Sequence, residues 1–284
     1  MVVINVYPQK VSKELFAEYE DTLKIMAHSI MNGKNEVEKS KANQLFISTL
    51  KEVLQYEGSF TYPFDSLKTI SIKKSKDNNV RIYTWIFKKD NGIYQYFGFV
   101  HYKNKTKKRY EIIELKDNSK EIRRPENKDL DNNNWYGALY YEIIYIKKPG
   151  RKYYILLGWD GNNDLSTKKI IDVMFFAGKG KIRFGASIFK KKKKTTKRYI
   201  LEYNSTSTIS VRFDEKEKRI LFNHLIPMRK GLEGLYDYYV PNGTYNAFNY
   251  ENGKWIFRSD VVVRNSNTNN VPKREKLKTG IIPK

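Results

Sequence analysis

The feature that most constrains the fold of this chain is an alternation of apolar and polar residues with a period of two, which runs from Tyr62 to Phe257. Such alternation is typical of strands with one buried face, because successive side chains of a strand point to opposite faces of a sheet. Turn residues separate the alternating segments. Asp90-Asn91-Gly92 is the clearest hairpin turn, because Asn and Gly tolerate a positive φ.

Helical periodicity is confined to the first 58 residues. From Ser12 to Ile30 apolar residues recur at helical spacing, and Asn32-Gly33 is a plausible stop. A second helix is predicted to begin at Asn35, which forms a capping pair with Glu38, and to end at Gly58. Because the two helices are short neighbours, we expect an antiparallel helical hairpin.

These patterns predict an α+β fold that is mostly β, with an N-terminal two-helix hairpin followed by a large antiparallel β meander that forms a sandwich, a barrel or a partial propeller. The expected organisation is a helical hairpin over residues 1–58 packed on a β body over residues 59–264, then a mobile basic tail over residues 265–284. A hydrophobic share of 40% and an aromatic share of 14% suit a packed core. No Gly/Ser-rich linker separates the hairpin from the body, so one compact unit is expected.

Several classes of site are excluded by residue types that the chain lacks. There is no Cys, which excludes disulfides, thiol nucleophiles and Cys-ligated metals. No apolar run approaches the ~20 residues of a membrane-spanning helix. His28, His101 and His224 lie apart, without the spacing of a zinc site, and are expected to be packed or edge residues. Neither a G-x-S-x-G elbow nor a glycine-rich phosphate motif occurs.

The formal charge of +23 would ordinarily indicate a nucleic acid or an anionic surface as partner. The excess of Lys is, however, spread along the chain, which favours a solvated, composition-driven surface. The densest run, "FKKKKKTTKRY", lies between two predicted strands and is expected at an exposed hairpin tip. Its candidate anion-binding residues are Lys190, Lys191, Lys192, Lys193, Lys194, Lys197 and Arg198.

The stretch "YYILLGWDGNNDLSTKKIIDVMFF" contains the best candidate for a metal site. Asp160, Asn162 and Asp164 stand at alternate positions, as oxygen ligands of calcium do. Leu165 replaces the glycine of an EF-hand loop, and Ile171 replaces its closing glutamate. A turn whose Asp and Asn side chains accept from backbone amides is therefore favoured over a calcium loop. No other cofactor is expected.

Two carboxylates embedded among large apolar residues are the candidate catalytic groups. Glu142 lies in "LYYEIIY" and Glu202 in "YILEYN". Each is expected either to be desolvated, with a raised pKa, or to pair with a nearby Lys or Arg, and pairing is favoured. Two such carboxylates facing one cleft are the arrangement that glycoside hydrolysis uses.

Several segments together carry a family resemblance: "YPFDSLKTISI", "RIYTW", "WYGALYYEII", "LLGWDGNND", "TKKIIDV", "RFGASIF" and "GKWIF". In these the chain resembles a group of uncharacterised Bacteroidota proteins of unknown function, chiefly flavobacterial. The resemblance implies a periplasmic or cell-surface location, because members of the group carry an export signal, and it brings no catalytic residue with it. The first residues, "MVVINVYPQK", lack the basic start of a secretory signal, so a cytoplasmic location stays open.

Three functional hypotheses follow. The favoured one is a non-enzymatic β-rich binding or structural module of the cell envelope, with an envelope protein or a polyanion as its partner. The alternative is an anion-binding or nucleic-acid-binding protein, which requires Lys190–Lys194 to converge with Lys107, Lys108, Arg109, Lys147 and Lys148 on one face. The second alternative is a carboxylate-dependent hydrolase, which requires Glu142 and Glu202, or Asp160 and Asp164, to share an open pocket.

Overall fold

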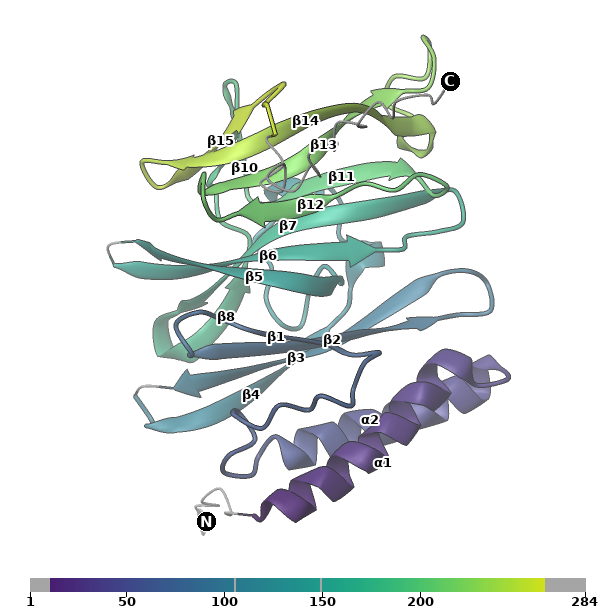
Figure 1. Cartoon of the computed structure of the whole chain (residues 1–284), viewed down its shortest axis with the longest axis vertical. Helices are drawn as coiled ribbons and strands as arrows, with labels where there is room; N and C mark the ends of the chain where they lie inside the picture. The colour runs from purple at the N-terminus through teal and green to yellow at the C-terminus, as the bar shows by residue number, and fades with distance from the viewer. Residues whose placement is uncertain (1–10, 105, 149, 264–284) are drawn as a thin grey trace, which may run out of the picture.

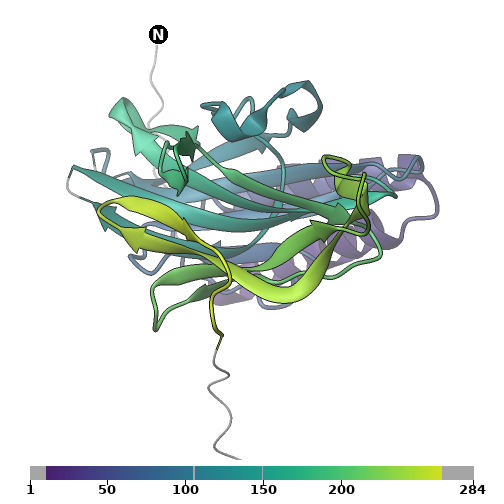
Figure 2. The same cartoon turned by 90° about the horizontal axis from the view of Figure 1, so that it is seen from above.

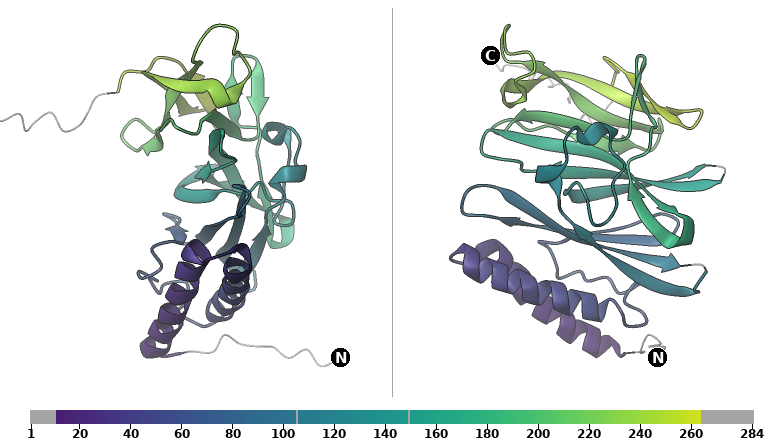
Figure 3. Two further views of the ribbon diagram at one scale, coloured as in Figure 1. Left: turned by 90° about the vertical axis from the view of Figure 1, so that its right-hand side faces the viewer. Right: turned by 180° about the vertical axis from the view of Figure 1, so that it is seen from behind.

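The computed structural model describes residues 11–104, 106–148 and 150–263. Its elements form four stacked layers, a helical hairpin followed by three sheets built almost entirely from antiparallel pairs (Figure 1). The helices cover the outer face of the first sheet, and the third sheet lies at the opposite end of the stack (Figure 3). The predicted α+β fold, mostly β after an N-terminal two-helix hairpin, is confirmed.

The helical hairpin consists of α1 (Lys13–Asn32) and α2 (Glu36–Val53). The predicted capping pair of α2 is present, because Asn35 Oδ1 accepts from the Glu38 amide at 2.9 Å and the Glu38 carboxylate accepts from the Lys34 amide at 3.0 Å. The predicted end of α2 at Gly58 was too late. The chain leaves the helix at Leu54, whose carbonyl accepts from the Ser59 hydroxyl at 2.9 Å.

The first sheet has the order β1-β2-β3-β4 and packs one face on the helices. Trp85 is buried in this core beside Phe46, and its indole Nε1 donates to Asn43 Oδ1 at 2.7 Å. This bond explains a polar residue on the buried face of α2. The strands are β1 (Ser71–Lys74), β2 (Val80–Lys88), β3 (Tyr94–Asn104) and β4 (Arg109–Lys116).

The second sheet has the order β11-β7-β6-β5, with β8 also paired to β7. A core that includes Ile82, Leu156 and Met174 lies between it and the first sheet. Its strands are β5 (Leu139–Lys148), β6 (Arg151–Asp160), β7 (Ser166–Ala177), β8 (Lys181–Phe184) and β11 (Tyr199–Asn204). The polar connection before β5 contains two short 3-10 helices, η1 (Ser119–Glu121) and η2 (Pro125–Asn127).

The third sheet has the order β10-β9-β15-β14-β13-β12 and covers the second sheet when seen from above (Figure 2). A core that includes Val173, Phe222 and Phe248 joins these two layers. The strands are β9 (Phe189–Lys191), β10 (Lys194–Thr196), β12 (Val211–Asp214), β13 (Arg219–Pro227), β14 (Tyr239–Glu251) and β15 (Lys254–Arg258). The short helices η3 (Gly178–Gly180) and η4 (Tyr236–Tyr238) precede β8 and β14.

The path of the chain between the second and third sheets is more complex than the predicted simple meander. The segment "IRFGASIF" is divided between β8 and β9, which belong to different sheets. Gly185 marks the break, since its φ is +93° and a Cβ there would lie 2.7 Å from the Lys128 carbonyl oxygen. The chain then returns to the second sheet as β11, and β9 pairs with β15 in parallel.

The β body is a stack of open sheets, so the sandwich is the nearest of the three predicted architectures; none of the sheets in the described ranges closes on itself. None of the described helices has the length and apolar character needed to cross a membrane. The tail predicted over residues 265–284 lies outside the described residues.

Candidate functional site

A cleft of about 1040 Å³ opens between β11, at the edge of the second sheet, and the inner face of the third sheet. We call it the basic-rimmed cleft. It brings together residues from β11, β13, β14 and β15, the β9–β10 hairpin, and the connection around η2. Two groups of the sequence-predicted candidates line it, namely Glu202 and the lysines Lys191–Lys194.

The floor of the cleft is aromatic. Tyr199 packs against both Phe222 and Phe248, with ring centroids 5.5 Å and 4.9 Å away, and Phe257 lies 6.1 Å from Phe222. Phe222 and Phe248 are fully buried, whereas Tyr199 and Phe257 are half-buried. Period-two alternation places these rings on the inner face of the third sheet and at the start of β11.

The rim of the cleft is basic. A hairpin tip occurs within the basic run, as predicted; it lies at Lys192-Lys193, with Lys192 at a φ of 54°, and Lys191 to Lys194 are exposed. The ammonium of Lys191 lies 4.3 Å from the ring centroid of Phe257, a cation–π distance. Burial against this surface, and then the charge of Lys192, lower the pKa of Lys191.

Across the cleft, Arg124 and Glu126 come from the connection around η2. The lining contains the five cations Arg124 and Lys191–Lys194 against the two carboxylates Glu126 and Glu202, a surplus of three positive charges. Of the two carboxylates, Glu202 is committed within the protein, since it accepts from the Ser166 hydroxyl at 2.6 Å. The field of the cleft therefore favours an anion.

The other residues of the basic run, Lys190, Lys197 and Arg198, do not line the cleft. Lys190 is exposed on β9, and Lys197 forms an ion pair with Asp129. Arg198 is fully buried, and its Nε lies 3.1 Å from Asp172 Oδ2. Lys197 and Arg198 are each paired with a carboxylate outside the cleft, so the anion-facing part of the run is Lys191–Lys194.

Glu142 and Glu202 do not share a cavity. Glu142 lines a different groove, along β5, where its Oε2 accepts from the Phe213 amide at 3.3 Å. Burial raises the pKa of Glu142. Two carboxylates lining separate cavities cannot act as the acid and base of one hydrolytic step.

The Asp160–Asp164 segment forms a turn between β6 and β7. Asp160 is buried and accepts from the Tyr96 hydroxyl and the Asn162 amide, both at 2.8 Å, and burial raises its pKa. Asn162 Oδ1 accepts from the Lys168 ammonium at 2.8 Å, and Asp164 is exposed. No group of three or more His, Cys, Asp or Glu able to hold a metal ion occurs within the described ranges.

The three histidines also lie apart. His28 is exposed on α1, and His101 is buried in β3. His224 lines the basic-rimmed cleft, where its Nδ1 lies 3.4 Å from the Thr244 hydroxyl and 3.8 Å from an Asp260 carboxylate oxygen.

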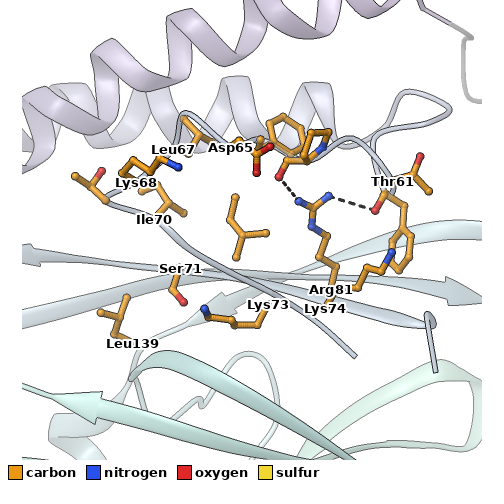
Figure 4. A pocket seen from close by; sticks show the side chains of 15 residues that line it. Thr61, Asp65, Leu67, Lys68, Ile70, Ser71, Lys73, Lys74, Arg81 and Leu139 are labelled. Atoms are coloured by element: carbon orange, nitrogen blue, oxygen red, sulfur yellow. Dashed lines mark hydrogen bonds between the residues drawn. The ribbon is translucent and has the colours of Figure 1, made fainter. Parts of the chain in front are cut away.

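A second pocket, of about 590 Å³, lies between β1 and the connection that follows α2 (Figure 4). Its only buried charge is the guanidinium of Arg81, which donates to the Phe60 and Pro63 carbonyl oxygens at 3.2 and 2.5 Å and also to that of Tyr62. Arg81 thus holds this connection against the first sheet, and its donors are used within the protein.

The aromatic floor was not identified from the sequence, because its rings come from four strands whose assignment to two sheets depends on non-local pairing. The basic hairpin and Glu202 were identified, but not their proximity. No family model matches the chain, and neither the curated proteins nor the solved structures compared with it gave a match.

Proposed function

We propose that this protein is a non-enzymatic binding module that holds a small anionic ligand with an apolar or aromatic body in the basic-rimmed cleft. The observation that carries the proposal is the combination, in one cleft of about 1040 Å³, of an aromatic floor and the lysine hairpin Lys191–Lys194. Ligand sites typically have such a composition, a mostly apolar wall with a few polar groups that fix orientation.

The two parts of the cleft would supply different contributions to binding. Burial of about 200 Å² of apolar ligand surface on the rings is worth about 5 kcal/mol at ~25 cal/mol per Å², before the cost of association. The lysines attract the anionic group, more strongly than in bulk water because the apolar floor lowers the local dielectric constant. An anionic amphiphile uses both contributions at once.

The hydrolase alternative has less support. It needs two carboxylates in one open site, but Glu142 lies in the groove along β5 and Glu202 in the cleft. Asp160 is buried and bonded to Tyr96, whereas Asp164 is exposed beside Lys88, 3.8 Å away.

A fluorescence titration with 8-anilinonaphthalene-1-sulfonate, an aromatic anion, tests the binding proposal. We expect saturable binding whose affinity falls as the salt concentration rises. The affinity of the Lys192→Glu/Lys193→Glu variant should be about tenfold lower than that of the parent. A matched charge reversal on the helical hairpin, Lys24→Glu/Lys41→Glu, should leave the affinity unchanged. Absence of saturable binding, or equal losses in both variants, would refute the proposal.

Competition experiments with two natural types of anion then show whether the apolar part of the ligand is an aliphatic chain or an aromatic ring. Displacement of the probe by dodecanoate indicates an aliphatic chain, and displacement by adenosine monophosphate indicates a stacked ring. Displacement by either compound supports the cleft as the site. If neither compound displaces the probe, and the Lys192→Glu/Lys193→Glu variant binds the probe as the parent does, the cleft is not the site.

Nucleic-acid binding is the second candidate, favoured by exposed basic residues in neighbouring turns. Lys107 and Lys108 in the β3–β4 turn, Arg109 at the start of β4 and Lys147 before the β5–β6 turn are exposed, and the two hairpins lie on the same side of the stack, in the first and second sheets (Figure 1). A salt titration of single-stranded DNA binding tests this candidate, because phosphate contacts give a steep salt dependence. No binding at about 50 mM salt removes it.

The location in the cell envelope is part of the first proposal and is supported by the family resemblance alone. Fractionation of cells that express the natural gene, with detection by antibody, tests it. Recovery in the periplasmic or surface fraction is expected, and recovery with cytoplasmic markers would contradict the envelope location without affecting the proposal for the cleft.

A further inference from the structure

The edge of the second sheet at β5 forms a groove distinct from the basic-rimmed cleft. This edge groove, of about 580 Å³, is lined by every residue of β5 from Tyr141 to Lys147. Because successive side chains of a strand point to opposite faces, a lining of seven consecutive residues means that the backbone edge of the strand faces the groove. Above and below lie the edge strands of the other sheets, β12 and β1.

The neighbouring edges are covered by side chains. The outer peptide groups of β12 are satisfied by β5, because the Tyr141 hydroxyl donates to the Val211 carbonyl at 2.9 Å and Glu142 accepts from the Phe213 amide at 3.3 Å. At the start of β5, the Tyr140 carbonyl accepts from the Ser71 hydroxyl of β1 at 2.5 Å. Such covering is how proteins commonly protect edge strands.

The segment Ile143–Lys147 lacks this cover. Its backbone pairs only with β6, and no other hydrogen bond to its peptide groups is found within the described part of the chain. Alternate peptide groups of a strand paired on one side point away from its partner. At ~3.3 Å per residue, five residues present an open edge about 16 Å long.

The surroundings of this open edge are basic. Lys73 and Lys74 of β1, Lys147 of β5 and Lys218 of the β12–β13 turn line the groove, and none is within ion-pair distance of a carboxylate among the described residues. Lys76 differs, since it pairs with Glu215 at 2.5 Å. The uncommitted cations therefore exceed the carboxylates available to neutralise them.

The walls of the groove are apolar. Phe213, Tyr250 and Trp255 of the third sheet and Tyr145 of β5 lie along it. An added strand would place alternate side chains against these walls, and backbone hydrogen bonds would provide the rest of the affinity.

We propose that an extended, acidic segment of a partner protein adds to β5 as a further strand of the second sheet. The open edge supplies the backbone bonds, the apolar walls accept alternate side chains, and the four lysines select acidic residues. A second copy of this chain is a poor occupant, because each copy carries a formal charge of +23.

The test is fluorescence anisotropy with a labelled peptide, acetyl-Glu-Val-Glu-Val-Glu-Val-Glu-amide, and two N-methylated forms, one methylated at every Val and one at every Glu. In a strand, alternate amides face opposite sides, so only one methylated set removes the donors that face β5. We expect one form to bind about tenfold more weakly than the other. Equal affinity of the two methylated peptides, or no binding of the parent peptide at about 50 mM salt, would overturn the proposal.

The lysines of the groove are tested with the Lys73→Glu/Lys218→Glu variant, whose affinity for the parent peptide should be about tenfold lower. The control variant Lys24→Glu/Lys41→Glu should bind the peptide as the unmodified protein does. The first variant should still bind the sulfonate probe in the cleft, so failure at the groove is separate from failure of the proposed function. Self-association through β5, seen by sedimentation, would assign the edge to a second copy instead. If a single-stranded oligonucleotide bound more tightly than the peptide, and the Lys73→Glu/Lys218→Glu variant lost that affinity too, the edge groove would be assigned to nucleic acid instead.

Discussion

Arg198 and Asp172 form an ion pair in which both side chains are fully buried, with Arg198 Nε 3.1 Å from Asp172 Oδ2. The same guanidinium donates to the Lys128 carbonyl at 3.1 Å and to that of Pro125. Arg198 immediately precedes β11, so the pair fixes β7, the connection around η2, and the strand that forms one side of the basic-rimmed cleft.

Removing one partner of this pair should be costly. Asp172→Ala leaves the Arg198 guanidinium buried without a counter-charge, and we expect a loss of about 3–5 kcal/mol in the free energy of unfolding. Urea denaturation followed by tryptophan fluorescence measures it. The Asp172→Leu/Arg198→Met variant should lose less than the sum of the two single changes, because no unpaired charge remains. Additive losses would show that the two residues act independently.

His101 should make the stability depend on pH. It is fully buried, with Phe60 and Tyr110 against its ring, and neither ring nitrogen has a hydrogen-bond partner in the described structure. Burial, and then the charge of Arg81, lower its pKa from 6.5 to about 3. Below pH 6.5 the unfolded chain takes up a proton that the folded one does not, so stability is lost as the pH falls.

The expected slope from this one residue is about 1.4 kcal/mol per pH unit between the two pKa values. His101→Phe keeps a planar ring and removes the proton site, so the difference in stability between the variant and the parent should grow with that slope from pH 6.5 toward pH 4. Urea denaturation at several pH values measures the difference, in which the contributions of all other groups cancel. A constant difference would contradict the prediction.

Two buried tyrosines form a matched pair for testing hydrogen bonds. The Tyr83 hydroxyl is buried and has no partner in the described structure, whereas the Tyr96 hydroxyl bonds Asp160 and the Gly161 amide, both at 2.8 Å. Tyr83→Phe should therefore be neutral or stabilising, because it removes an unsatisfied polar group. Tyr96→Phe should cost about 1–3 kcal/mol, because it removes one of the two donors to the buried Asp160 and the acceptor of the Gly161 amide. Thermal denaturation of the two variants compares them, and equal losses would contradict the assignment.

Local chemistry in the sequence was sufficient for much of the fold. The caps Ser12 and Asn35 fix where the helices begin, and the Asp90-Asn91-Gly92 turn joins β2 to β3 as predicted. These features depend on neighbours a few residues apart, for which propensity and spacing are direct evidence.

The features that could not be predicted depend on residues far apart in the chain. Asn43 on the buried face of α2 is explained only by Trp85, and the burial of Arg198 only by Asp172. The same holds for the parallel pairing of β9 with β15, which closes the cleft around Phe257. Binary patterning indicates that a residue is buried or exposed but not against which strand, so the candidate site was predicted as separate pieces.

The aromatic floor and the basic rim of the cleft should contribute separably to the binding of 8-anilinonaphthalene-1-sulfonate. Phe257→Leu removes a half-buried ring beside Lys191 and should weaken binding about threefold to tenfold while leaving its salt dependence unchanged, because an aromatic surface is lost but no charge is removed. Lys192→Ala/Lys193→Ala should weaken binding at low salt and flatten its salt dependence, because two exposed cations are lost. Titrations of both variants at about 20 and 300 mM salt make the comparison. If Phe257→Leu flattened the salt dependence as much as the lysine variant does, floor and rim would not act as separate parts of the site.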